Sequence, residues 1–129
     1  MDRLDRRVTE RISGPSWTVM RIKFERIART LLSVSETARG DLTTIYVKFV
    51  AEETANHPYA VVWLKKSSEI VVGLALPEEP RMPVLAAAKR GYHYAGLTAF
   101  LTIGQEDEVP PEIEQWARDA YVHAKAKIQ

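Results

Sequence analysis

Apolar residues between positions 16 and 31 recur at the spacing of an amphipathic helix. After the break at Ser13-Gly14-Pro15, with Ser16 as the expected N-cap, they follow one another at steps of three or four residues. The stripe consists of Trp17, Met20, Phe24, Ile27, Ala28 and Leu31. Val19 and Ile22 lie off this stripe, which predicts a second contact surface for the helix. That surface is either the N-terminal segment or another subunit, and the second option would make the protein a homodimer.

Beyond residue 40 the apolar pattern changes to a period of two, which is typical of strands. In "TTIYVKFVAE" one predicted face carries Ile45, Val47, Phe49 and Ala51, and the other carries Tyr46 and Lys48. The stretches "PYAVVWLKK" and "EIVVGLALP" follow, joined by the short polar link 66–69. They predict an antiparallel hairpin. Because both stretches are apolar on both faces, the hairpin is expected inside a sheet, covered by helix on at least one side.

The second half of the chain predicts one further strand between two helices. Prolines 77, 80 and 83 break the pattern, after which "VLAAAKR" predicts a short helix and "LTAFLTI" a strand. In that strand Leu97, Ala99, Leu101 and Ile103 alternate with Thr98, Phe100 and Thr102, so the four are expected on one face. The closing helix follows Val109-Pro110-Pro111 and has the stripe Ile113, Ala117, Ala120, Tyr121, Ala124 and Ile128.

This order of elements predicts a single α+β domain over residues 1–129. We expect an antiparallel or mixed sheet of about four to five strands, packed by an N-terminal and a C-terminal helix. Residues 1–40 form a basic helical N-terminal segment in this interpretation, and residues 42–127 form the α+β core.

The composition is typical of a globular protein in a reducing compartment. The chain has 129 residues, of which 46% are hydrophobic and 27% charged, enough for one domain with a real core. It contains no cysteine, which excludes disulfides, thiolate metal sites and cysteine nucleophiles and suits a reducing compartment. No apolar run approaches the roughly 20 residues that span a bilayer, and the N-terminus lacks a secretory pattern. We therefore expect a cytoplasmic protein without a membrane partner.

Charge is unevenly distributed along the chain. Residues 1–39 hold nine Lys and Arg against five Asp and Glu, whereas the remaining residues hold nine against twelve. This asymmetry predicts a basic surface that could bind nucleic acid weakly. Its candidate residues are Arg21, Lys23, Arg26, Arg29, Lys89 and Arg90. A solvated charged helix is the favoured alternative, because dedicated nucleic-acid binders are usually far more basic.

Known catalytic and phosphate-binding motifs do not fit. In "GYHYAGLT", residues 91–98, the glycine spacing matches a phosphate-binding loop, but Leu97 replaces the lysine and a strand follows where a helix is required. Glu53 and His57 have a metal-ligand spacing but lie in a stretch that predicts a turn. The sequence thus predicts no catalytic residue, metal or cofactor, and leaves open an enzyme whose residues assemble only in three dimensions.

The most suggestive stretch for binding is Tyr-His-Tyr between two glycines. Tyr92, His93 and Tyr94, together with Trp63, could line a small-molecule pocket, because aromatic rings offer flat surface and polar tips. Interleaved with Lys89 and Arg90, they could also hold phosphates and stack planar groups. The favoured alternative places both tyrosines in the sheet core, with the basic pair ending a short helix capped by Gly91. Lys65 and Lys66 on the hairpin would lie nearby only if the fold brings them there.

Three stretches carry a family resemblance: "VVWLKK…VVGLALP", "GYHYAGLTAFLTI" and "VPPEIEQWARDAYVHA". Over roughly residues 42–127 the chain resembles domain-of-unknown-function family 5655, a family of small bacterial domains. The resemblance implies a stand-alone or appended domain with a binding or accessory role, and it places His93 where such sequences carry aromatic or histidine residues. The layout is more loosely similar to small frataxin-like α+β domains. These would imply an acidic metal-binding surface, but the chain lacks a dense acidic helix.

The sequence therefore predicts a non-enzymatic binding or accessory domain. The first alternative is weak nucleic-acid binding through the basic N-terminal helix. The second is a small-molecule-binding or enzymatic pocket around Tyr92, His93 and Tyr94.

Overall fold

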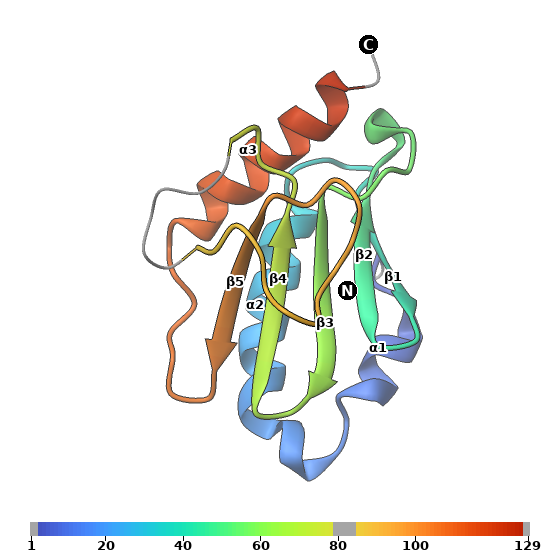
Figure 1. Ribbon diagram of the computed structural model, residues 1–129. Coiled ribbons are helices and arrows are strands. Elements are labelled where there is room, and N and C mark those ends of the chain that lie inside the picture. The colour runs from blue at the N-terminus through green and yellow to red at the C-terminus, as the bar shows by residue number, and fades with distance from the viewer. Residues whose placement is uncertain (1–2, 79–84, 128–129) are drawn as a thin grey trace.

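The computed structural model describes residues 3–78 and 85–127, which form an α+β domain built on one antiparallel sheet (Figure 1). Its five strands lie side by side in sequence order, and each pairs with the next. They are β1 (Arg39–Thr43), β2 (Tyr46–Val50), β3 (Ala60–Lys66), β4 (Glu69–Leu74) and β5 (Ala99–Gly104). The predicted α+β class and strand number are confirmed, and the described strands are antiparallel throughout.

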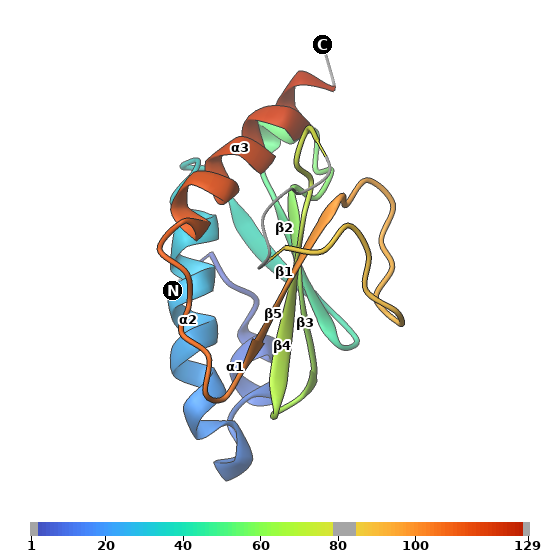
Figure 2. The same ribbon diagram turned by 60° about the vertical axis from the view of Figure 1, so that its left-hand side comes forward.

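Helices cover one face of this sheet. The short helix α1 (Arg6–Arg11) and the 3-10 helix η1 (Pro15–Trp17) precede α2 (Thr18–Leu32), and α3 (Ile113–Ala126) closes the chain. Figure 2 shows α2 and α3 on the same side of the strands. The predicted N-terminal and C-terminal helices are therefore confirmed. Ser16 is not an N-cap, because the turn at Gly14-Pro15 runs through η1 directly into α2, whose N-cap is Trp17 without a side-chain hydrogen bond.

The main hydrophobic core lies between these helices and the sheet. Its helical part comprises the predicted stripe from Trp17 to Leu31 with Leu32 added, Val8 of α1, and the α3 residues Ile113, Trp116, Ala117, Ala120 and Ala124. The Tyr59 hydroxyl is buried there and donates a hydrogen bond of 2.6 Å to the Leu31 carbonyl at the end of α2. This bond satisfies one of the carbonyls that a helix leaves unpaired at its C-terminus. Burial raises the pKa of Tyr59 above its ordinary value. The remaining contributors from the strands include Val47, Phe49, Val62, Leu64, Ile70, Val72, Leu101 and Ile103.

Strand β1 was not predicted, because Arg39-Gly40-Asp41 has low strand propensity. The strand forms because neighbouring segments pair with it on both sides. On one side Gly40 lies opposite Phe49 of β2, and on the other side it bridges Leu4 in parallel orientation. The Gly40 amide donates to the Arg3 carbonyl at 2.9 Å, and the Gly40 carbonyl accepts from the Asp5 amide at 2.8 Å. A side chain at position 40 would collide with Leu4, since an added Cβ would lie 2.7 Å from its Cδ1.

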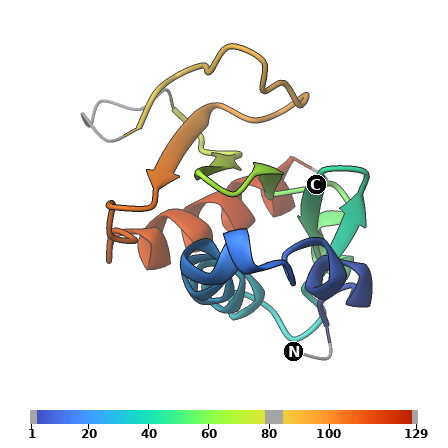
Figure 3. The same cartoon turned by 90° about the horizontal axis from the view of Figure 1, so that it is seen from below.

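The opposite face of the sheet is covered by the irregular loop 85–98. Beneath the loop, Val61, Trp63, Val71, Tyr92 and Phe100 form a second, smaller core. Figure 3 shows the loop on one side of the strands and the helices on the other. The hairpin strands are therefore covered on both sides, which explains why they are apolar on both faces.

Two predictions about this region are wrong. The described residues 85–90 form no helix, because Ala86 pairs with Phe100 at the edge of β5 through two hydrogen bonds of 2.9 and 2.8 Å. Gly91 thus caps no helix. Its φ of 86° forms the turn between the paired residues Lys89 and Tyr92.

Two side chains also face the other way from the prediction. Ile45 lies in the turn between β1 and β2, beside Thr44 with a φ of 50°, and packs against the second core. Leu97 packs against the second core as well, because the chain enters β5 only at Ala99. The predicted positions Pro80, Pro83 and Ile128 lie outside the described residues.

The side chains off the α2 stripe are exposed. Val19 is 45% exposed and Ile22 is 68% exposed, so the described N-terminal residues do not form their second contact surface. Within the described residues, no helix has both the length and the apolar character to cross a bilayer.

Candidate functional site

The four predicted ligand-binding residues divide between the second core and the surface. Trp63 and Tyr92 are buried and pack edge-on, with ring centroids 5.5 Å apart and an interplanar angle of 90°. Phe100 also packs against Trp63, with ring centroids 6.1 Å apart and an interplanar angle of 38°. These rings fix loop 85–98 to the sheet. His93 is exposed, and Tyr94 is half-buried.

The Tyr-His-Tyr stretch borders a surface hollow of about 420 Å³. The hollow is lined by residues of the loop, Ala87, Ala88 and most of the segment 92–97, and by Phe100 of β5. The structure thus brings Tyr92, His93 and Tyr94 to one hollow, with Trp63 beneath Tyr92 rather than in the lining.

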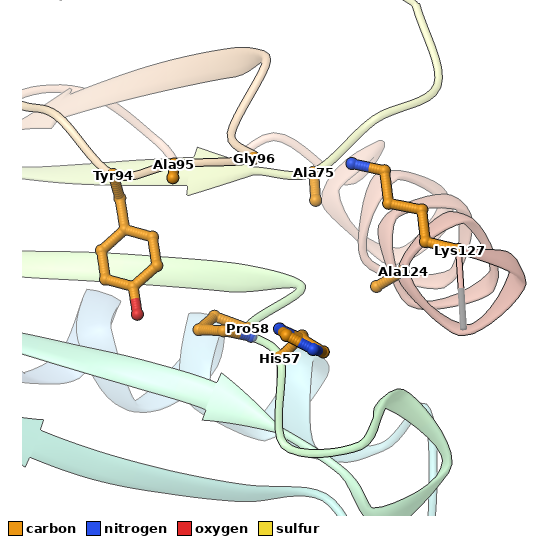
Figure 4. A pocket seen from close by; sticks show the side chains of 8 residues that line it. All are labelled: His57, Pro58, Ala75, Tyr94, Ala95, Gly96, Ala124 and Lys127. Carbon is orange, nitrogen blue, oxygen red and sulfur yellow. The ribbon is translucent and has the colours of Figure 1, made fainter.

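A second pocket, of about 390 Å³, shares Tyr94 and Ala95 with this hollow (Figure 4). Four segments that are distant in sequence meet there. Its lining residues are His57 and Pro58 before β3, Ala75 after β4, Tyr94, Ala95 and Gly96 from the loop, and Ala124 and Lys127 at the end of α3. Figure 4 shows Tyr94 at one end of the pocket, Lys127 at the other, and His57 with Pro58 between them.

The polar groups of this pocket are a phenol, an imidazole and an ammonium. Tyr94 and Lys127 supply hydrogen-bond donors, and His57 supplies a ring that can donate or accept. Pro58 and the alanines supply apolar wall. Gly96 is required by its backbone, because its φ of 93° is disfavoured for other residues while an added Cβ would meet nothing within 4 Å. The arrangement suits a small ligand with an acidic group and an apolar body.

Sequence reasoning did not include His57 or Lys127 in a site. His57 follows a turn in which Ala55 and Asn56 have φ of 50° and 62°, which agrees with the predicted turn. No spacing links these residues to Tyr94, so only their approach in space identifies the pocket.

Glu53, which has a metal-ligand spacing to His57, is hydrogen-bonded on the other side of the turn. The Glu53 carboxylate accepts hydrogen bonds from the Thr37 hydroxyl at 2.6 Å and from the Ser35 hydroxyl at 2.9 Å. The hydrogen bond from Thr37 contributes most to lowering the pKa of Glu53. Residues 3–78 and 85–127 contain no group of three or more acidic or histidine side chains arranged to hold a metal ion.

The six residues of the predicted basic surface do not form one surface. Arg21 donates to the carbonyls of Ile12 and Gly14, at 2.8 and 3.1 Å, and so joins α1 to α2. Lys23 donates to the carbonyls of the segment after β5, at Gly104, Gln105 and Asp107.

The other four residues are divided between two faces of the domain. Arg26 and Arg29 are exposed on α2, whereas Lys89 and Arg90 lie on the loop across the sheet.

Comparison of the chain with protein-family models, with curated proteins and with solved structures found no match. The fold and the site by themselves define a small α+β domain with a ligand-sized pocket at one end of its sheet.

Proposed function

We propose that the protein is a non-enzymatic binding domain that holds a small organic anion in the pocket beside Tyr94. One observation carries this proposal: Tyr94, His57 and Lys127 come from three separate segments and meet around a volume of about 390 Å³. Pockets that bind small molecules usually have volumes of about 300–1,000 Å³ and combine apolar wall with a few polar groups.

The polar groups favour an acidic ligand. The Lys127 ammonium offers a positive charge, and the His57 imidazole and the Tyr94 hydroxyl offer further hydrogen bonds. The phenol ring of Tyr94 and the ring of Pro58 offer flat apolar surface to the ligand's body. The ligand class is therefore a carboxylate or phosphate ester with a small apolar or planar part.

The same lining favours binding over catalysis. Its described residues include no carboxylate, serine, threonine or cysteine, so no acidic side chain there orients His57 as a general base and no hydroxyl or thiol of those types lies beside it. We also propose an accessory role in a bacterial cell, which is what the resemblance to family 5655 over roughly residues 42–127 would imply. The absence of cysteine supports the cytoplasm as the compartment.

The proposal is tested by titrating the protein with a panel of small carboxylates and phosphate esters, followed by calorimetry. Lys127→Gln should weaken binding of a hit by about 10- to 100-fold, because a hydrogen bond to a charged group is lost. Ala95→Phe should fill part of the pocket without changing its charge, because Ala95 is one of its lining residues.

Lys125→Gln is the matched control, since Lys125 is an exposed lysine on the same helix that does not line the pocket. Its affinity should equal that of the unaltered protein. An affinity that is the same in Lys127→Gln, Ala95→Phe and the unaltered protein would contradict the proposal, as would the failure of the whole panel to bind.

A further inference from the structure

The sheet face opposite the helices carries aromatic rings and cations together. Val47 and Phe49 point into the main core, so Tyr46 and Lys48 of the same strand point to this opposite face. Figure 1 shows loop 85–98 in front of β3 and β4, while β1 lies beside it uncovered. We call this surface the aromatic–basic face and define it by Tyr46, Lys48, Lys65, Lys89, Arg90 and Tyr94.

Two lysines from distant elements meet over one ring of this face. The Lys65 ammonium of β3 lies 4.5 Å from the centroid of the Tyr92 ring and donates to the Gly91 carbonyl at 3.0 Å. The Lys89 ammonium of the loop lies 5.7 Å from the same centroid. Within the described residues neither lysine forms an ion pair. The two ammonium groups are held beside the same ring, and neither is paired with a carboxylate. Their combined positive charge favours the approach of an anion.

Half-buried tyrosines lie next to these cations. The Tyr46 ring packs against Trp63 at 6.0 Å and edge-on against Tyr94 at 5.9 Å, which holds both tyrosines in place while part of each stays accessible. The one carboxylate on the neighbouring strand, Asp41 opposite Lys48, is paired with Arg39 at 3.2 Å. The face therefore combines fixed aromatic surface with unneutralised positive charge.

We propose that the aromatic–basic face binds single-stranded nucleic acid. Bases pack against Tyr46 and Tyr94, and phosphates lie beside Lys48, Lys65 and Lys89. This combination of stacking surface and cations is how proteins hold single strands without sequence preference. The tyrosine rings favour a nucleic acid over an acidic peptide, because bases can stack on them. A single strand is favoured over a duplex, because the bases of a duplex already stack on one another. The site shares Tyr94 with the anion pocket but uses other cations. It also shares Lys89 and Arg90 with the basic surface expected from the sequence, but none of the residues of α2.

The experiment is a fluorescence anisotropy titration of labelled oligo(dT) and oligo(rU) of about 12 nucleotides, repeated over a range of salt concentrations. Binding should weaken with salt, with a log–log slope of about −0.7 for each phosphate neutralised. The Lys48→Gln/Lys65→Gln variant should reduce the size of that slope by about 1.4. Tyr46→Leu should weaken binding by about 5- to 150-fold and leave the slope unchanged.

Arg26→Gln/Arg29→Gln is the matched control, because it removes the same charge from the exposed part of α2. Its binding should equal that of the unaltered protein. Since Lys65 also holds the loop, Lys48→Gln alone serves as the second variant and should reduce the slope by about 0.7.

Three outcomes would overturn the inference. They are no strand binding at low salt, an equal loss in the Arg26/Arg29 control, and binding of poly-glutamate at least as tight as that of the strands. Lys127→Gln should leave strand binding unchanged, which separates this inference from the proposed pocket.

Discussion

Asp5 joins three parts of the chain with one carboxylate. One oxygen accepts the Arg7 amide at 3.0 Å and so caps α1, while the other accepts the Leu42 amide of β1 at 3.1 Å. The Arg7 guanidinium lies 2.8 Å from that second oxygen. The hydrogen bond from the Arg7 side chain is the first cause that holds the pKa of Asp5 well below its usual range, followed by the bond from the Arg7 amide. The folded protein therefore favours the ionised form of Asp5.

This lowered pKa makes a prediction about acid stability. Because the folded pKa lies below the unfolded value of about 3.9, the contribution of Asp5 is fully present above about pH 4 and is lost as the pH falls further. Asp5→Asn should lower the free energy of unfolding at pH 7 by about 1 kcal/mol and make its decline below pH 4 shallower. Urea unfolding at a series of pH values measures both effects.

Glu106→Gln, which changes an exposed carboxylate after β5, is the control and should behave like the unaltered protein. An Asp5→Asn variant with an unchanged pH profile would contradict the assigned role.

At the scale of elements, loop 85–98 is attached to the sheet by close packing and by backbone hydrogen bonds. The Thr98 amide donates to the Leu74 carbonyl at 2.9 Å, and the Thr98 hydroxyl donates to the Leu76 carbonyl at 2.8 Å. Leu97 lies directly over Gly73 of β4, where an added Cβ would be 2.6 Å from its Cδ1 and 3.1 Å from the Trp63 ring. The loop can approach the sheet this closely only because position 73 has no side chain.

Gly73→Ala should therefore push Leu97 away from the sheet and loosen the loop. We expect the free energy of unfolding to fall by about 1–3 kcal/mol, as is usual when a packed site is overfilled. Limited proteolysis should cut the loop faster, and urea unfolding should show the loss of stability.

Gly14→Ala is the matched glycine control. Its φ of −65° suits alanine, and the nearest atom to an added Cβ is 3.9 Å away. If Gly73→Ala were as stable and as resistant to protease as Gly14→Ala, the close approach of Leu97 would not matter for the fold.

At the scale of the whole molecule, the N-terminal segment is part of the domain's core. Met20, Phe24, Ile27 and Leu31 of α2 are all fully buried against the sheet. Residues before α1 also cover the outer edge of β1, which would otherwise present unpaired backbone groups. The boundary suggested by the charge pattern near residue 40 therefore does not divide the packing of the structure.

A chain restricted to residues 42–127 should consequently not fold. Removing α2 exposes the inner face of the sheet, and burial of each large apolar side chain stabilises a domain by about 1.5–3 kcal/mol. Loss of four such side chains is comparable to the total stability of a domain, about 5–15 kcal/mol. Circular dichroism and urea unfolding would show the loss of folded structure, with the full chain as reference. A cooperative unfolding transition of the short chain would contradict this expectation.

The sequence predicted much of the fold because the strongest signals are local. The α2 and α3 stripes and the β3–β4 hairpin follow from the spacing of apolar residues, and the α+β class follows from their order. Local signals misled at "VLAAAKR", whose alanines favour a helix in isolation. In the protein, pairing of Ala86 with Phe100 outweighs that preference.

The candidate site was predicted only in part, for the same physical reason. Sequence alone pointed to Tyr92, His93 and Tyr94, because the residues are adjacent and chemically distinctive. It could not show that Lys65 meets Tyr92, because contacts between distant segments depend on the packing of the whole chain.

The periodic elements and the class of the domain thus follow from the amino-acid sequence alone. Strand β1, the course of loop 85–98 and the meeting of His57, Tyr94 and Lys127 depend on how the whole chain packs. The separation of the predicted basic residues onto two faces depends on that packing as well. Periodicity is encoded by neighbours within a few positions, whereas these features arise between residues that approach only when the sheet and helices pack together.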